Sequence, residues 1–254
     1  MRDAEILDVV LRDLRAEFAD ELLGVIATGS RIRGEGDPAS DIDVPVLIAQ
    51  PRRQRRNVVV AGVEVEMFIN PPWRFLKYLE GDRADGTGAA QHMLVTGHII
   101  HDPTGAAAEL CDEARRQWEA GPPALTATDQ WSFRYFAADS LRDIDDVMTA
   151  DPARAALLGG PFLLWLLERH YRIQRRWRPK PKRLLLDLAT WDAHAASLAR
   201  SAVGRDGGAG CLRGLADHVM APLGGLMPLA WNTEWEELLE PPPNGPLSGL
   251  PEPG

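Results

Sequence analysis

The first twenty residues follow a helical pattern of apolar and polar positions. Apolar side chains recur three or four positions apart, at Ile6, Leu7, Val10, Leu11, Leu14 and Phe18. This spacing predicts an amphipathic helix over residues 3–20. Charged residues fill the positions between them, so one face of the helix is expected to pack on the rest of the protein.

Short apolar runs then replace the helical pattern and predict strands. The runs are Leu23–Thr28, Asp41–Ile48, Val58–Ala61, Val63–Ile69 and Ile99–His101. Gly62 separates the third run from the fourth and predicts a hairpin turn. Pro71 or Pro72 can begin a helix that continues to Leu79, and His92–Thr96 also has a helical pattern.

Beyond residue 126 only helical patterns remain. They lie near residues 127–148, 153–175, 182–202 and 211–222. The glycine- and proline-rich stretch 120–123 predicts a linker, residues 205–210 predict a loop, and the composition of residues 241–254 predicts a disordered tail. We therefore expect an α/β (α+β) fold: a small mixed sheet with flanking helices at residues 1–120, then a helical-bundle domain at 125–240.

Composition narrows the class of protein. The 254 residues are 45% hydrophobic and carry a net charge of −9, which argues against a general nucleic-acid-binding surface. Cys111 and Cys211 stand far apart and predict no disulfide framework. The N-terminus lacks the apolar core of a signal peptide, and no run reaches the roughly 18 apolar residues of a membrane span. We expect a cytoplasmic protein without membrane association.

Candidate chemistry lies between the first two predicted strands. Gly29 and Ser30 form a turn after the first strand, and Asp41 and Asp43 stand two positions apart in the second. Side chains two apart on a strand face the same side, so these carboxylates are expected to adjoin. Like charges so close repel each other unless a cation lies between them, and carboxylate oxygens suit Mg²⁺.

The turn itself offers groups that suit a phosphate. Glycine lets the backbone approach closely, and the free N–H groups and the Ser30 hydroxyl can donate hydrogen bonds. We place Arg31 and Ser40 in the same ligand-binding set. Arg31 and Arg33 follow the turn, where they either meet a triphosphate or are simply solvated.

A third carboxylate is expected from the strand at residues 63–69. The apolar side chains of this strand face one way and its two glutamates the other: Val63, Val65 and Met67 against Glu64 and Glu66. We favour Glu66 as the third metal ligand and as the base that activates an acceptor hydroxyl. Glu64 is the alternative ligand, and a solvated strand face is the alternative interpretation.

Together these residues resemble the motif of the DNA polymerase β nucleotidyltransferase superfamily. Gly29-Ser30, ten intervening residues, Asp41-x-Asp43 and a later carboxylate are similar to the pattern of aminoglycoside, lincosamide and minimal nucleotidyltransferases. The resemblance covers residues 22–70 most closely. It implies a small mixed sheet and two-metal catalysis, in which Asp41 and Asp43 bridge both ions and Glu66 holds the ion at the acceptor.

The resemblance implies transfer of a nucleoside monophosphate, with AMP from ATP as the first expectation. Two Mg²⁺ ions are expected, with Mn²⁺ as a substitute, and the expected acceptor is a hydroxyl of a small molecule such as an aminoglycoside-like antibiotic. The alternatives are toxin-like transfer to a protein or tRNA, and a catalytically silent nucleotide-sensing module. A homodimer also fits, because related enzymes sometimes share a site across two subunits.

Basic residues gather where the second helix of the helical half is expected to end. Pro179 and Pro181 break that helix and place the charges on a loop. Lys180 and Lys182 are candidates for binding the β- and γ-phosphates, and a surface patch at a helix end is the alternative. Glu168 either faces a cleft toward the acceptor or lies on the surface. The six histidines of the chain form no recognisable set of metal ligands.

Overall fold

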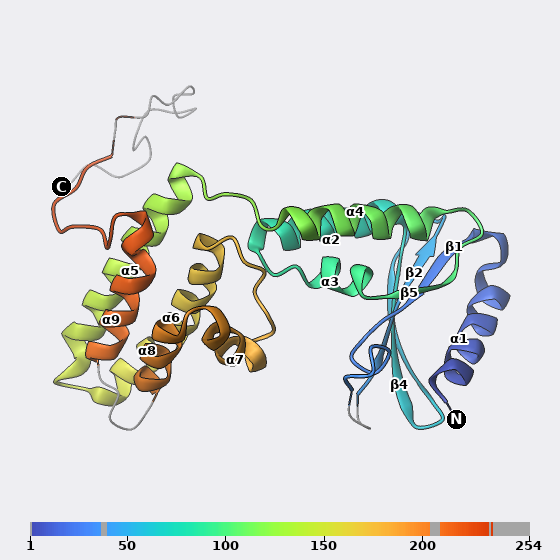
Figure 1. The fold of residues 1–254 in the computed structure, drawn as a ribbon, viewed down its shortest axis with the longest axis horizontal. Coiled ribbons are helices and arrows are strands. Elements are labelled where there is room, and N and C mark those ends of the chain that lie inside the picture. The colour runs from blue at the N-terminus through green and yellow to red at the C-terminus, as the bar shows by residue number, and fades with distance from the viewer. Residues whose placement is uncertain (1, 37–39, 204–208, 234, 236–254) are drawn as a thin grey trace, which may run out of the picture.

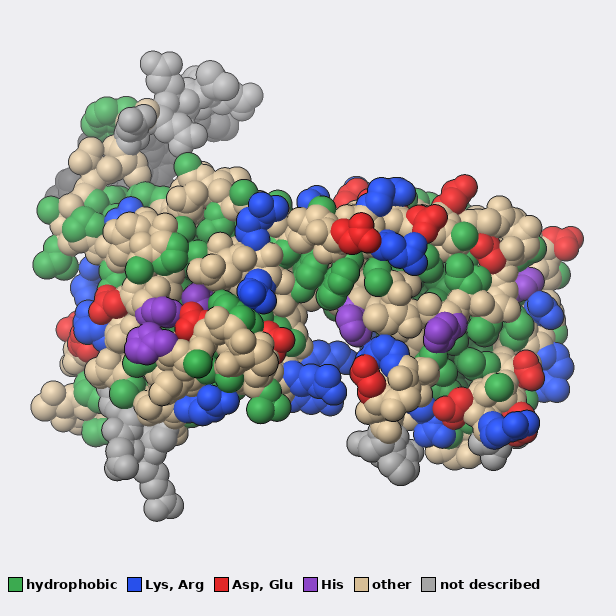
Figure 2. Space-filling view, in the orientation of Figure 1, with side chains coloured by type: hydrophobic (Ala, Val, Ile, Leu, Met, Phe, Trp, Pro, Cys, Tyr) green, Lys and Arg blue, Asp and Glu red, His purple; other side chains and the backbone are tan. Residues whose placement is uncertain are grey.

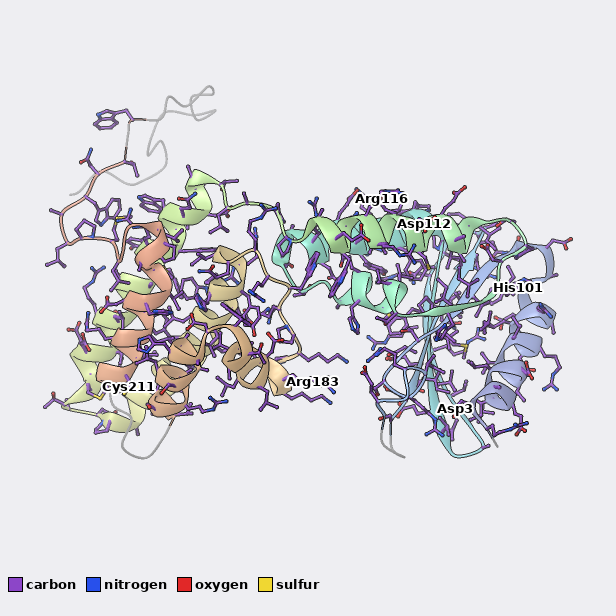
Figure 3. All side chains as sticks on the ribbon, viewed as in Figure 1. Asp3, His101, Asp112, Arg116, Arg183 and Cys211 are labelled. Carbon is purple, nitrogen blue, oxygen red and sulfur yellow. The ribbon has the colours of Figure 1, made fainter. Side chains whose placement is uncertain are left out.

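The structure is a computed structural model and describes residues 2–36, 40–203, 209–233 and 235. The chain forms a sheet part, up to residue 120, and a helical part, from residue 127 onward, which lie side by side (Figure 1). Figure 2 shows a hollow between them with Lys and Arg side chains at its rim. Arg183 extends from the helical part toward the sheet part (Figure 3).

A mixed sheet forms the centre of the sheet part. Its strands are β1 (Leu22–Ala27), β2 (Ile42–Ile48), β3 (Gln54–Val60), β4 (Val63–Asn70) and β5 (His98–His101). They lie in the order β3-β4-β2-β1-β5. β4 runs parallel to β2, and every other neighbouring pair is antiparallel. The predicted α/β class with a small mixed sheet is confirmed.

Helices cover both faces of this sheet. α1 (Asp3–Phe18) packs on one face, against buried side chains such as Val44 and Val65. α2 (Pro72–Asp85), α3 (Ala89–Val95) and α4 (Ala106–Ala120) pack on the other, where Ile26 and Leu47 are buried. Alternate residues of β2 and β4 therefore enter two different cores, as the period of two in a strand requires.

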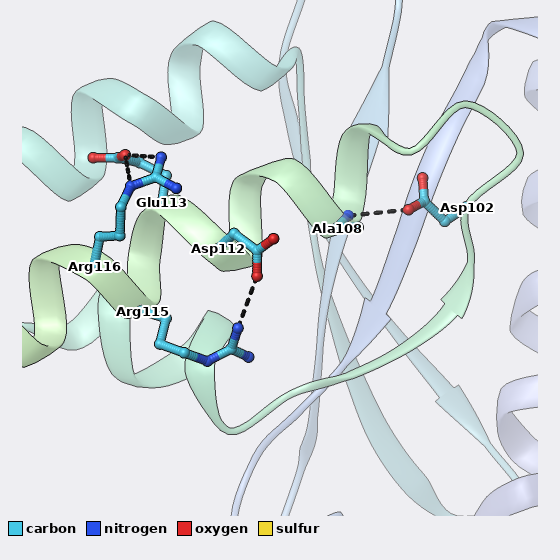
Figure 4. Close-up of polar contacts among 6 residues, drawn as sticks. All are labelled: Asp102, Ala108, Asp112, Glu113, Arg115 and Arg116. Atoms are coloured by element: carbon cyan, nitrogen blue, oxygen red, sulfur yellow. Dashed lines mark hydrogen bonds and ion pairs between the residues drawn. The ribbon is translucent and has the colours of Figure 1, made fainter.

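The helix α4 was absent from our sequence prediction, which assigned no element to residues 106–120. The carboxylate of Asp102 accepts hydrogen bonds from the backbone N–H groups of Ala107 (3.1 Å) and Ala108 (3.0 Å), and so caps the helix. Figure 4 shows the cap at Ala108 together with ion pairs on the exposed side, Asp112–Arg115 and Glu113–Arg116. The missed signal is the helical spacing of its buried residues, Ala107, Leu110, Cys111 and Ala114.

The helical part contains no strand among its described residues, as predicted. Its helices are α5 (Ala127–Met148), α6 (Pro152–Ile173), α7 (Pro181–Trp191), α8 (Ala193–Val203) and α9 (Ala209–Met220). Buried side chains from all of them form one core, including Leu141, Leu166, Leu188, Ala199 and Leu215. Within the described residues, no helix is long and apolar enough to cross a membrane.

Two predictions for the helical part need correction. The single helix expected at 182–202 is wrong, because the chain breaks at Asp192, whose carboxylate accepts a hydrogen bond from the N–H of Ala195 (2.9 Å) and starts α8 there. In the loop expected at 205–210, residues 204–208 lie outside the described residues, while Ala209 and Gly210 already belong to α9. The tail predicted at 241–254 also lies outside them.

Candidate active site

The end of β1 lies directly against the start of β2. Thr28 and Asp43 exchange backbone hydrogen bonds of 2.8 and 3.0 Å. Gly29 follows with φ +109°, and a Cβ added to it would lie 3.4 Å from Oδ2 of Asp43 and 3.3 Å from the carbonyl oxygen of Asp41. Glycine suits this position because it adopts such a φ without strain and leaves the adjoining carboxylate room.

Three carboxylates meet at this place. Asp43 and Glu66 are register partners across the parallel pair β2–β4, and Asp41 directly precedes β2. Asp41, Asp43 and Glu66 each offer an oxygen within 4.8 Å of the others, and all three side chains are half-buried. Glu64 instead is exposed and accepts a hydrogen bond from the side chain of Asn57. The structure therefore brings Glu66 to the aspartate pair.

Asp43 has a raised pKa. Burial, followed by the charges of Asp41 and Glu66, raises the pKa of Asp43 to about 6, against the opposing charges of Lys180 and Arg55. A raised pKa means that the ionised carboxylate is held at a cost in free energy.

These donors fit a divalent cation. They are all carboxylate oxygens, the class of ligand that Mg²⁺ and Mn²⁺ prefer. A cation among them would also relieve the repulsion that raises the pKa of Asp43. Asp41, Asp43 and Glu66 are therefore the residues that would hold a metal in the sheet part.

Glu66 has a partner that the sequence did not indicate. Strand β3 begins at Gln54 rather than at Val58, so Arg55 belongs to the strand and not to a loop before it. Nε of Arg55 donates to Oε1 of Glu66 at 2.6 Å, and its guanidinium lies 5.0 Å from the ring centroid of Phe68. The hydrogen bond from Arg55 lowers the pKa of Glu66. Arg55 thus gives Glu66 a cationic partner beside the aspartate pair, and both roles predicted for Glu66, metal ligand and base, stay predictions.

Thr28 is a candidate that sequence reasoning missed. Its hydroxyl is buried and has no hydrogen-bond partner among the described residues. Directly paired residues of neighbouring strands project from the same face, so Thr28 lies beside Asp43. A buried hydroxyl without a partner costs about 1–3 kcal/mol, and a bound phosphate or metal-ligated water would supply the missing partner. The sequence marked Thr28 only as the end of a strand.

The two serines predicted near the turn lie beside the carboxylates in sequence, whereas the predicted arginine forms an ion pair with α1. Ser30 and Ser40 are half-buried, the first directly after Gly29 and the second directly before Asp41. Nε of Arg31 forms an ion pair of 2.6 Å with Asp3, at the start of α1. This contact ties Arg31 to the helix that covers the opposite face of the sheet, in addition to any role toward a ligand.

The predicted basic loop lies between α6 and α7, at residues 174–180, and contacts the sheet part through ring stacking and hydrogen bonds. The indole of Trp177 stacks on Trp118 of α4, with ring centroids 5.1 Å apart, and its N–H donates to the Trp118 carbonyl at 2.9 Å. The backbone N–H of Arg178 donates to the Gly86 carbonyl at 2.8 Å. Arg172, just before the loop, donates to the Pro123 carbonyl at 2.7 Å. Several cations that we grouped as a patch therefore have structural partners.

Lys180 is placed differently from these arginines. It is exposed at the end of the loop, and its positive charge lowers the pKa of both Asp43 and Glu66. Lys182 is exposed in the first turn of α7. The charge of Lys180, from the helical part, thus acts on the carboxylates of the sheet part.

Glu168 neither faces an open cleft nor projects freely into solvent. Its carboxylate forms ion pairs with Arg178, in the basic loop, and with Arg169 (3.7 Å). The side chain is about one-fifth exposed. Its position supports the conformation of the loop that ends at Lys180.

Comparison with known proteins agrees with this geometry. Residues 7–80, which run from α1 into α2 and include all three carboxylates, match the family model of the nucleotidyltransferase domain. Among solved structures, a nucleotidyltransferase-like protein from Exiguobacterium sibiricum 255-15 superposes with a TM-score of 0.54 at 15% identity, over 85% of this chain and 74% of that one. This likeness shows a shared fold. No curated protein sequence matches significantly.

Proposed function

We infer that this chain, a nucleotidyltransferase of the polymerase β superfamily by the domain at residues 7–80, transfers AMP from ATP to a hydroxyl group of a small molecule. One observation carries the proposal. Asp41, Asp43 and Glu66 offer oxygens within 4.8 Å of one another, beside a glycine turn whose backbone can approach a phosphate.

Each residue of the site has a role in the proposal. Two divalent cations, Mg²⁺ or Mn²⁺, would when bound stabilise the charge on the entering and leaving oxygens of an in-line displacement at the α-phosphorus. Asp41 and Asp43 would hold both ions, and Glu66 would hold one of them. The acceptor oxygen forms a bond to the α-phosphorus as its hydroxyl proton passes to water. The bond from the α-phosphorus to the oxygen shared with the β-phosphate breaks, and pyrophosphate leaves.

The nucleotide is held by the turn and by the basic loop. The backbone N–H groups after Gly29 and the hydroxyls of Ser30 and Ser40 donate to phosphate oxygens. Lys180 neutralises the β- and γ-phosphates. Its charge lowers the pKa of both Asp43 and Glu66, which supports this role. Lys182 is the second candidate for this role.

The acceptor is proposed to be small and cationic, as an aminoglycoside is. The net charge of −9 suits such a molecule. Four arginines at positions 52–56 are the basic group nearest to the carboxylates in sequence that a tRNA could contact. Two of them pair within the chain: Arg55 with Glu66 and Arg56 with Glu17, each at 2.6 Å. Internal pairing leaves fewer free charges for a polyanion.

The test follows radiolabel from each of the four nucleoside triphosphates, labelled at the α-phosphorus, into size-fractionated cell extract with Mg²⁺ or Mn²⁺. We expect ATP to label a small-molecule fraction, and the Asp41→Ala/Asp43→Ala variant to label none. Label on protein or RNA would replace the small-molecule acceptor by the toxin-like alternative. Metal-dependent nucleotide binding without transfer to any fraction would instead support a silent sensing module.

A further inference from the structure

Two of the six histidines of the chain contact one aspartate in the helical part. Nε2 of His170, in α6, lies 2.8 Å from Oδ2 of Asp192, and Nε2 of His218, in α9, lies 2.7 Å from the same oxygen. Asp192 itself joins α7 to α8. Residues far apart in sequence therefore bring two imidazole nitrogens and a carboxylate to one point, within 4.8 Å of one another.

A third imidazole lies next to this group. The ring centroid of His194, in the first turn of α8, is 5.1 Å from that of His218. The group is enclosed on its other side, where the ring of His170 is 2% exposed and stacks on Trp191. The three ligand atoms therefore lie between a buried aromatic stack and a partly exposed edge.

Asp192 is oriented toward the two histidines. Its Oδ1 accepts a hydrogen bond from the Ala195 N–H at 2.9 Å, which leaves Oδ2 directed at the imidazoles of His170 and His218.

We propose that His170, Asp192 and His218 bind a transition-metal dication of the Zn²⁺ class, with water in the fourth position. Imidazole nitrogen and carboxylate oxygen are ligands that Zn²⁺ takes tetrahedrally, at about 2.0–2.2 Å. Ligand atoms around such an ion lie about 3.3 Å apart. The present contacts of 2.7 and 2.8 Å would open by about half an ångström to admit it.

The proposed site differs in chemistry and position from the three carboxylates of the sheet part. Its nitrogen ligands favour Zn²⁺ over Mg²⁺. It would tie α6, the α7–α8 junction and α9 together close to the end of α6, after which the basic loop leads to Lys180. The bound metal is therefore expected to stabilise the helical part and the conformation of that loop.

The alternative is a hydrogen-bonded cluster without metal affinity, and Asp192→Asn separates the two interpretations. Asparagine caps helices as well as aspartate does, so this variant keeps the start of α8 and removes the charge that a metal needs. His218→Ala removes one ligand, and its side chain is one-third exposed, so little core packing is lost. His101→Ala, in β5, is the matched control for loss of a histidine outside the cluster.

The experiment uses the full chain with Asp41→Ala/Asp43→Ala, so that the carboxylate site does not compete. After treatment with a chelator, the protein is titrated with Co²⁺ and Zn²⁺, following the visible absorption of cobalt and thermal unfolding. We expect one metal per chain, the absorption of four-coordinate cobalt, and stabilisation by Zn²⁺. Affinity should fall at least about 100-fold in His218→Ala and Asp192→Asn, since loss of an outer-shell partner alone costs 10- to 100-fold, and His101→Ala should leave it unchanged.

Two results would overturn the proposal. One is the absence of cobalt absorption and of stabilisation by Zn²⁺ in the protein with an intact cluster. The other is binding that is equally strong in His218→Ala and Asp192→Asn. Circular dichroism of each variant without metal shows whether it is folded, so that lost binding is not confused with unfolding. Neither result depends on nucleotidyl transfer.

Discussion

At the level of single residues, Asp43 is one of the three carboxylates of the site, and keeping it ionised there destabilises the folded protein. It lies in β2 between Asp41 and Glu66, and burial together with these carboxylates raises its pKa to about 6. Because the folded-state pKa lies above the ordinary value, folding favours the protonated form. The free-energy cost of ionising Asp43 in the folded protein is absent at a pH below 3.8, the ordinary pKa of an aspartate. It grows as the pH rises and is complete above about pH 6.

Asp43→Asn should therefore stabilise the metal-free protein while abolishing transfer. At neutral pH we expect the free energy of unfolding to rise by on the order of 3 kcal/mol, since each unit of pKa shift is worth about 1.4 kcal/mol. The gain should shrink near pH 5. Urea unfolding with a chelator present, at both pH values, measures it.

Asp143→Asn, on the exposed side of α5, is the control and should change stability little at either pH. A destabilised Asp43→Asn protein, or a gain of equal size at both pH values, would contradict this view of the site.

Sequence reasoning reached the carboxylates but not their partners. Asp41, Asp43 and Glu66 follow from the period of two in a strand, which needs no knowledge of neighbouring elements. The contact of Arg55 with Glu66 depends on where β3 begins and on its register with β4. The placement of Thr28 beside Asp43 depends on how β1 meets β2. Register is set by long-range pairing, which a local pattern does not contain.

At the scale of elements, close packing of α4 on β1 holds the sheet and its second layer of helices together. A Cβ added to Gly24 of β1 would lie only 2.8 Å from the Cβ of Ala107 in α4. Gly24 also adjoins an irregularity in the pairing of β1 with β2. The helix approaches the strand this closely because residue 24 has no side chain.

Gly24→Ala is expected to destabilise the fold by about 1–3 kcal/mol, the usual cost of overpacking. Gly81→Ala is the matched control, because Gly81 lies inside α2 with no atom within 4 Å of an added Cβ. There the same change should stabilise by about 0.5–1 kcal/mol through helix propensity. Urea unfolding gives the free energy of unfolding of both variants. Equal changes in the two would show that α4 does not pack on β1 as described.

Element boundaries show which local signals the prediction used and which it missed. The helical period continues through residues 182–202, so periodicity alone predicts one helix. The carboxylate of Asp192 instead caps a new helix at Ala193, and a cap can end one helix and start another without breaking the apolar pattern. For α4, both the period and the capping Asp102 were present in the sequence and were not used.

At the scale of the whole molecule, the two parts contribute opposite charges to one place. The sheet part supplies the three carboxylates, and the helical part supplies Lys180 at the end of a loop that is fastened to α4 by Trp177. Sequence analysis predicted the loop and its charges. It did not place the loop opposite the carboxylates, because that position depends on the contacts of Trp177 and Arg178 with the sheet part.

Lys180→Gln should weaken nucleotide binding more than Lys182→Gln does. We expect the KM for the nucleotide to rise about tenfold in Lys180→Gln, as for loss of one charge-assisted contact, and to change less than about twofold in Lys182→Gln, given its place in the first turn of α7. Steady-state kinetics over a range of nucleotide concentrations separates the two. Equal effects of both substitutions would mean that the loop acts only through its overall charge.

The three carboxylates are proposed as the catalytic centre of nucleotidyl transfer. ATP labelled at the α-phosphorus and ATP labelled at the γ-phosphorus, each incubated with Mg²⁺ and the acceptor fraction, distinguish this reaction from phosphoryl transfer. We expect only the α label to reach the acceptor, the γ label to leave in pyrophosphate, and Asp41→Ala/Asp43→Ala to catalyse neither step. Transfer of the γ label, or undiminished transfer by that double variant, would show that these carboxylates do not catalyse nucleotidyl transfer.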